Sequence, residues 1–145
     1  MTKEETIKIM AMLGAFYGGG KSNPEVMATA WHLILSKYDY RIASKAVLDF
    51  AENDTREYAT FPAVGRIVQA IKSEMQREEA PIKEIVRAVS YGWQYDQLSQ
   101  DARQIIRKDK YDDWRNMDAE EFSSKAGVLA GTLKRSRKRL QGGAE

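Results

Sequence analysis

Residues 64–75 read VGRIVQAIKSEM, and this segment decides the fold class. Its apolar residues recur at the i, i+3, i+4 and i+7 spacing of one helix face, and they are Val64, Ile67, Val68, Ile71 and Met75. A strand would instead alternate apolar and polar residues, and no stretch of the chain sustains such an alternation of β-branched residues. The pattern therefore predicts an all-α protein without strands.

The N-terminal part of the chain carries two helix-start signals. Thr2 and Glu5 have the spacing of a capping box and predict a first helix, which three successive glycines then end. Asn23 and Pro24 predict a second start, because proline at the first helical position lacks only an N–H that every helix start leaves unpaired. A third helix is expected over residues 40–53. Apolar residues of the second helix repeat at helical spacing, and they are Val26, Met27, Ala30, Trp31, Ile34 and Leu35.

The other two prolines, Pro62 and Pro81, are interpreted as helix starts as well. Thr60 is expected to cap the helix that begins at Pro62, and this helix should end in the charged stretch of residues 77–79. Pro81 then begins a separate helix with an apolar stripe, which stops at Gly92.

The rest of the chain predicts three shorter or more polar helices. Ser99 is expected to cap a short helix, and Tyr111 and Trp114 belong to another. Asp118 is expected to cap the last helix, which runs over residues 119–140.

These helices are expected to form a small N-terminal helical bundle followed by a helical C-terminal unit. The chain has 145 residues, of which 43% are hydrophobic, so it can bury a core of ordinary size. The charged boundary divides it into residues 1–78, the bundle, and residues 79–141, the C-terminal unit with a basic last helix. Residues 142–145 are expected to be a disordered tail.

Composition argues against several classes of protein. The absence of cysteine excludes disulfides and thiolate metal sites. The longest apolar run is short and interrupted, so neither a signal peptide nor a membrane span is expected. A cytoplasmic location in a bacterial host and no membrane partner follow as expectations.

No catalytic, cofactor or metal site is predicted. His32 is the single histidine and is interpreted as structural, because no cysteine or patterned carboxylate pair accompanies it. Residues 18–22 read GGGKS, which resembles the end of a phosphate-binding loop, but the first glycine of that pattern is replaced by Ala15 and a helix precedes it. The protein is therefore expected to bind other macromolecules and not to be an enzyme.

A basic cluster lies near the C-terminus. Residues 133–140 read LKRSRKRL, and the five cations are Lys134, Arg135, Arg137, Lys138 and Arg139. Such a cluster can neutralise phosphates or meet an acidic protein surface. The alternative is a solvated helix end, whose positive charges favour the negative end of the helix dipole.

The C-terminal unit is also rich in aromatic residues. They are Trp93, Tyr95, Tyr111 and Trp114. Such residues can stack on bases or anchor a protein interface, but in so small a unit they are interpreted as core.

Several pieces in order resemble the replicative helicase loader/inhibitor proteins of phages of Gram-positive bacteria. They are MTKEETIKI at residues 1–9, AWHLIL at 30–35, YDY at 38–40, an alanine-rich helix ending near Phe50, and TFPAVGRI at 60–67. PIKEIVRAV at residues 81–89, Trp93 and the turn around Trp114 resemble the C-terminal part of such proteins more loosely.

The resemblance implies a phage or prophage DNA-replication adaptor that binds the hexameric replicative helicase and loads or inhibits it at the origin. An origin-binding initiator and DNA are further candidate partners. In that family helicase binding is attributed to a C-terminal segment that can be disordered, whereas this chain's C-terminal part is patterned for folding. The alternative function is a nucleic-acid-binding replication or regulatory protein that acts through its basic C-terminal helix, and a phage-encoded inhibitor of a host enzyme is a third.

Overall fold

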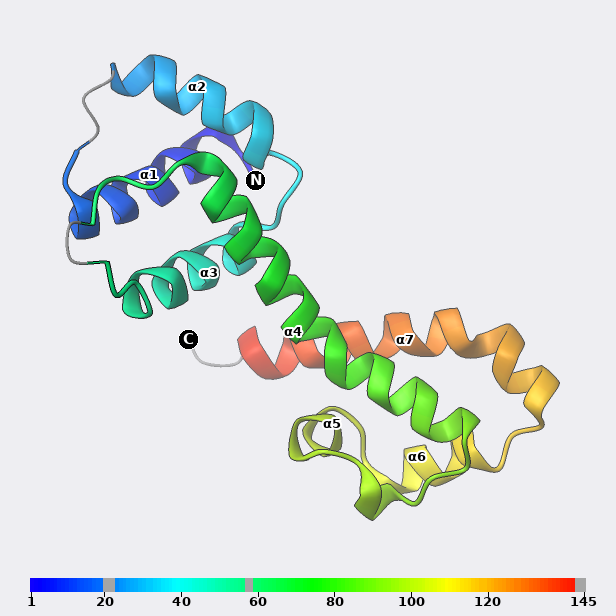
Figure 1. Ribbon diagram of the computed structural model, residues 1–145. Coiled ribbons are helices and arrows are strands. Elements are labelled where there is room, and N and C mark those ends of the chain that lie inside the picture. The colour runs from blue at the N-terminus through cyan, green and yellow to red at the C-terminus, as the bar shows by residue number, and fades with distance from the viewer. Residues whose placement is uncertain (20–22, 57–58, 143–145) are drawn as a thin grey trace. The chain divides into compact units, whose positions relative to one another are not determined.

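The computed structural model describes residues 1–19, 23–56 and 59–142, with side chains up to residue 135. These residues form helices and turns without a strand, which confirms the all-α prediction. The helices are α1 (Lys3–Tyr17), α2 (Pro24–Leu35), α3 (Tyr40–Glu52), α4 (Val64–Ser90), the 3-10 helix η1 (Tyr95–Gln97), α5 (Gln100–Ile105), α6 (Lys108–Arg115) and α7 (Ala119–Gly142) (Figure 1). The end of the expected tail and the lysine of the GGGKS segment lie outside the described residues.

The chain divides into two compact units, Met1–Gln76 and Arg77–Glu145. Each unit has its own hydrophobic core. Helix α4 supplies residues to both cores, because it begins before the division and ends after it.

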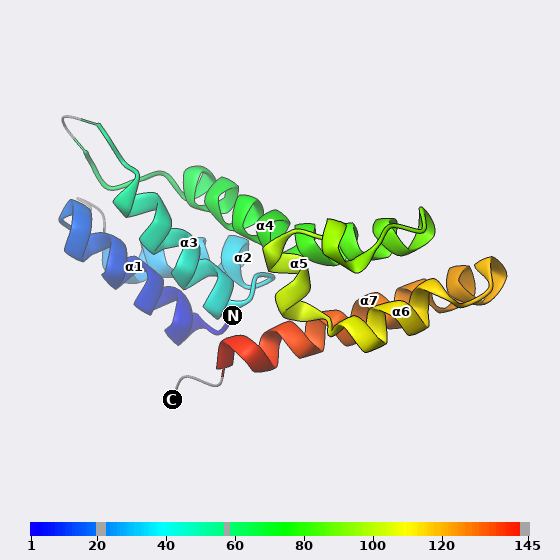
Figure 2. The same cartoon turned by 90° about the horizontal axis from the view of Figure 1, so that it is seen from below.

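In the first unit, α1 packs against both α2 and α3 (Figure 1 and Figure 2). The Thr2–Glu5 capping box is present as predicted: Glu5 N donates to Thr2 Oγ1 at 3.2 Å, and Thr2 N donates to the Glu5 carboxylate at 2.7 Å. Asn23 caps α2 with Pro24 at its first position, also as predicted. The buried core residues are Ile9, Leu13, Trp31, Leu35, Tyr38, Ala43, Ala46, Val47, Ile67 and Ile71.

The second unit packs short helices against α4 and α7. Its buried residues are Ile82, Ile85, Ala88, Val89, Leu98, Ala102, Ile105, Ile106, Tyr111, Trp114, Phe122 and Leu133. Ser99 caps α5 as predicted, and its own N–H and hydroxyl both donate to the Glu84 carboxylate at 2.6 Å. The Tyr111 hydroxyl donates to the Trp93 carbonyl at 3.0 Å, so a buried side chain fixes the turn after α4.

The prediction that Pro81 starts a separate helix is wrong. Pro81 lies inside α4, which is continuous from Val64 to Ser90. A proline in a helix interior costs about 3 kcal/mol, because it removes one hydrogen bond and crowds the preceding turn. The buried positions on α4 nevertheless stay in helical phase across the proline, from Ile71 to Ile82 and Ile85. Burial of an isoleucine contributes about 1.5–3 kcal/mol, so two such residues outweigh the proline.

The prediction for Pro62 is also wrong in its position. Helix α4 begins at Val64, so Pro62 precedes the helix and does not occupy its first turn. The chain enters α4 through a hydrogen bond from Arg66 N to the Ala63 carbonyl, at 3.0 Å. Phe61, beside the proline, packs its ring against Trp31 with centroids 5.7 Å apart, and this contact sets where the segment leaves the core.

Candidate partner-binding surfaces

Helix α2 is apolar on the side that faces the first core and on the opposite side. Ala28, Trp31 and Leu35 are buried in the first unit. On the outward side, Val26 is 68% exposed, Leu33 is 77% exposed, and Ala30 between them is exposed as well. Helical spacing alone could not separate these sides. The available signal was that a surface helix of this composition has apolar residues all round.

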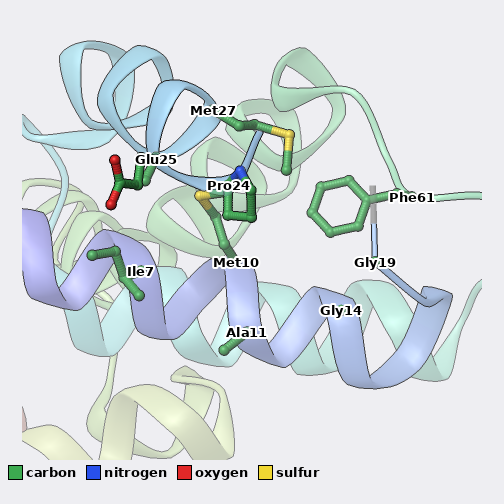
Figure 3. A pocket seen from close by; sticks show the side chains of 10 residues that line it. Ile7, Met10, Ala11, Gly14, Gly19, Pro24, Glu25, Met27 and Phe61 are labelled. Carbon is green, nitrogen blue, oxygen red and sulfur yellow. The ribbon is translucent and has the colours of Figure 1, made fainter. Parts of the chain in front are cut away.

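An apolar groove lies between α1 and the N-terminal half of α2 (Figure 3). Its volume is about 410 Å³, and its lining residues are Ile7, Met10, Ala11, Gly14, Gly19, Pro24, Glu25, Met27, Ala28 and Phe61. A Cβ atom placed at Gly14 would meet nothing within 4 Å, so the groove is open at that residue. Glu25 is the single charged side chain among the lining residues.

A second hollow shares Ile7, Glu25 and Ala28 with this groove. It extends along α2 through Val26, Thr29, Ala30 and Leu33, with Lys3 of α1 at its margin. The two hollows therefore form one surface, here named the α1–α2 face. Contiguous exposed apolar surface of this kind usually marks a site of macromolecular contact.

The basic cluster of the last helix is only partly described. Lys134 and Arg135 are exposed on α7, whereas Arg137, Lys138 and Arg139 lie beyond the residues whose side chains the structure describes. Arg135 donates to Thr132 Oγ1 at 3.4 Å, which leaves most of its guanidinium facing solvent.

Lys134 has an acidic neighbour that the local sequence did not reveal. Its Nζ lies 3.1 Å from Oε1 of Glu79 on α4, and Lys83 Nζ lies 3.1 Å from the other oxygen of the same carboxylate. Hydrogen bonds from Lys134 and then from Lys83 lower the pKa of Glu79 from its ordinary value. The expectation of five uncompensated cations is therefore wrong at Lys134, because an acid distant in sequence neutralises it.

His32 makes a contact typical of a structural histidine. Its Nδ1 lies 3.2 Å from the hydroxyl of Thr6, which is fully buried and also donates to the Thr2 carbonyl at 3.0 Å. Among the residues described, no group of three or more histidine, aspartate and glutamate side chains is arranged to hold a metal ion. None of the helices in that same part of the chain is long and apolar enough to cross a membrane.

The aromatic residues of the second unit separate into two sets. Tyr111 and Trp114 are buried, as predicted for core residues. Trp93 is 39% exposed, although its backbone N–H donates to the Ala88 carbonyl at 2.9 Å and its own carbonyl accepts from Tyr111. The core interpretation therefore does not hold for Trp93, whose backbone is fixed while its ring meets solvent.

A comparison with protein families matches residues 1–68 to the N-terminal domain of the phage helicase loader/inhibitor family. Residues 1–68 form a domain of that family. The match confirms the resemblance drawn from the sequence for this part of the chain. Searches of curated proteins and of solved structures gave no significant match. The loader/inhibitor domain covers α1, α2, α3 and the start of α4, so every residue that lines the α1–α2 face belongs to it.

Proposed function

We propose that this protein is a phage or prophage DNA-replication adaptor that binds the replicative helicase and controls it at the origin, in the bacterial host cytoplasm. The observation that carries the proposal is the match of residues 1–68 to a helicase loader/inhibitor domain. In this proposal the protein acts by binding and not by catalysis, and an origin-binding initiator is a second candidate partner.

We assign part of the contact with the partner to the basic end of α7. Arg135, Arg137, Lys138 and Arg139 are the residues that carry this assignment, since they add four positive charges within five positions. Lys134 has a smaller part, because its ammonium is engaged by Glu79. Clustered cations of this kind speed association with an acidic protein surface and also bind phosphates.

The main test mixes the protein with purified replicative helicase of the bacterial host. We expect a stable complex in size-exclusion chromatography and a changed rate of ATP hydrolysis by the helicase. The protein alone should hydrolyse no ATP, because no phosphate-binding loop is recognisable in the sequence. If neither a complex nor a rate change is found, the proposed function is wrong.

A second test separates helicase binding from direct DNA binding. One variant changes Arg135, Arg137, Lys138 and Arg139 to Gln, and its matched control changes Arg103, Arg107, Lys108 and Lys110 to Gln, so both lose four charges. Helicase binding is followed by pull-down and DNA binding by fluorescence anisotropy, each at low and moderate salt. Binding to DNA should fall steeply with salt, because each neutralised phosphate releases counterions. If the two variants behave alike in both assays, the basic end of α7 is only a solvated helix end.

A further inference from the structure

The outward side of α2 is an apolar surface whose partner can be inferred from the order of its residues. Val26, Ala30 and Leu33 occupy it at i, i+4 and i+7 spacing, and all three are exposed. A helix that is apolar on all sides is ordinarily covered on all sides. We propose that this surface pairs with the same surface of a second copy of the chain, with the two α2 helices antiparallel.

The side chains along this surface are complementary to themselves. Ala30 lies near the middle, with Val26 about one turn before it and Leu33 about one turn after it. In an antiparallel pair, Val26 of one copy therefore lies opposite Leu33 of the other, and the two Ala30 residues meet near the twofold axis. Small side chains at that position let the helix axes approach to about 8 Å, the short end of the range for packed helices.

The charges at the two ends of the surface are opposite in sign. Glu25 lies at its N-terminal end, and Lys37 lies just beyond its C-terminal end. Ser36 keeps a helical backbone (φ −53°, ψ −31°) and its N–H donates to the His32 carbonyl at 2.9 Å, so Lys37 continues the same side of the helix.

These charges select the antiparallel arrangement. With Val26 opposite Leu33, Glu25 of one copy and Lys37 of the other are offset along the axis by about 4.5 Å, three residues at 1.5 Å each. Two long side chains span that offset. A parallel pair would instead place Glu25 beside Glu25 and Lys37 beside Lys37. The antiparallel pair also sets the helix dipoles in opposite directions, which is favourable.

The size of the surface sets the expected strength of the dimer. One helix side with the neighbouring Ile7, which is 47% exposed, buries less than the roughly 1,200–2,000 Å² of a standard stable interface. We therefore expect a reversible dimer with a Kd of roughly 1–100 µM, weaker than an obligate homodimer.

The test is sedimentation velocity of the full chain over a concentration series that brackets this Kd. The wild type should pass from monomer to dimer within the series. Leu33→Asp should weaken the dimer by at least about tenfold, because it places a carboxylate in an apolar contact. The matched control is Leu48→Asp, which changes an exposed leucine on α3 and should leave the dimer unchanged. Circular dichroism establishes that both variants keep their helix content.

Two further experiments test the antiparallel geometry. Glu25→Lys and Lys37→Glu should each weaken the dimer, and the double variant should restore it, since the pair is then reversed. Ala30→Cys should form an intermolecular disulfide on mild oxidation, whereas Leu48→Cys should not, and the natural chain has no cysteine to interfere. The Ala30→Cys change is small, so this arm stays decisive even if Leu33→Asp disturbs the fold.

Two results would overturn the proposal. A wild type that stays monomeric throughout the series would mean that a different protein covers this surface. A dimer that survives Leu33→Asp and does not cross-link at position 30 would place the contact between copies elsewhere on the chain. Neither result bears on helicase binding, which is measured separately.

Discussion

The two units of this chain are held together by different means. The first unit, Met1–Gln76, packs helices of twelve or more residues, and its helix starts are fixed by caps within the same helix, such as the Thr2–Glu5 box. In the second unit, α5 has six residues and α6 has eight, too few to be stable alone. Polar side chains from elsewhere in the unit fix these short helices, as Glu84 does for Ser99 and Tyr111 for the Trp93 carbonyl. Long helices therefore rely on periodic burial, and short helices rely on specific polar contacts.

The largest effect is expected from removing the side chain that joins both kinds of contact. Tyr111→Ala deletes a fully buried ring that lies in edge contact with Tyr95, and it deletes the hydroxyl that holds Trp93. We expect the free energy of unfolding to fall by about 3–5 kcal/mol, as for other large buried aromatics. Urea denaturation measures this loss, and hydrogen exchange should place it in residues 77–145.

Tyr111→Phe is the matched control, because it keeps the ring and removes only the hydroxyl. Its cost should be about 1 kcal/mol, the usual contribution of one buried hydrogen bond. If Tyr111→Ala raised exchange equally over residues 1–76, the two cores would unfold as one cooperative unit and the contrast between the units would fail.

A smaller effect of opposite sign is expected at Pro81. Pro81→Ala restores a backbone N–H in the interior of α4 and removes a crowded ring, at the expense of some buried surface. We expect a net gain of about 1–2 kcal/mol from the difference in helix propensity less the lost burial. The measurement is thermal unfolding, with Gln76→Ala on an exposed position of the same helix as the control. A loss of stability would show that the proline ring is needed for packing.

The polar contacts of the second unit are tested at Glu84. Glu84→Gln keeps the shape of the side chain but replaces an ionised acceptor that receives both the N–H and the hydroxyl of Ser99. We expect a loss of about 1–2 kcal/mol, because hydrogen bonds to charged groups are stronger than neutral ones. Asp113→Asn, at an exposed position on α6, should change little. Equal effects of the two variants in urea denaturation would contradict the role given to Glu84.

The smallest effect is expected in the first unit, where Arg56 binds Asp54. Arg56 Nε and Nη2 donate to the carboxylate at 2.8 and 2.6 Å, and these hydrogen bonds hold the pKa of Asp54 well below its usual range. A lowered pKa means stability that is present above the ordinary carboxyl pKa of about 3.9 and is lost as the pH falls below it. Asp54→Asn should therefore lower the Tm slightly near neutral pH.

Circular dichroism melts of both proteins at several pH values check this expectation. The gap in Tm between wild type and Asp54→Asn should stay constant above about pH 5 and shrink in acid. Asp49→Asn, in the same unit, is the control for removal of one negative charge. A gap that grows as the pH falls would contradict the assignment to Asp54.

Local signals in the sequence predicted much of the fold. The caps of α1, α2 and α5 were recognisable because a cap lies within a few residues of the N–H groups it serves. Pro81 was misread because its local preference conflicts with the burial of Ile82 and Ile85, and packing is stronger than that preference.

The surfaces were harder to predict than the fold. Glu79 and Lys134 are 55 residues apart, and no local pattern connects them. The outward side of α2 was missed for another reason. Its apolar spacing resembles that of a core helix, and only the packing within the first unit determines which side is covered.

The shared use of α4 has a consequence for how such a domain can be transplanted. The segment that matches the family ends at residue 68, but Ile71, farther along α4, is fully buried in the first core. A fragment cut at residue 68, or a hybrid protein joined there, would lack this side chain and leave a void in that core. The segment that the family shares is shorter than the segment that folds, and an exchangeable module has to extend to Gln76.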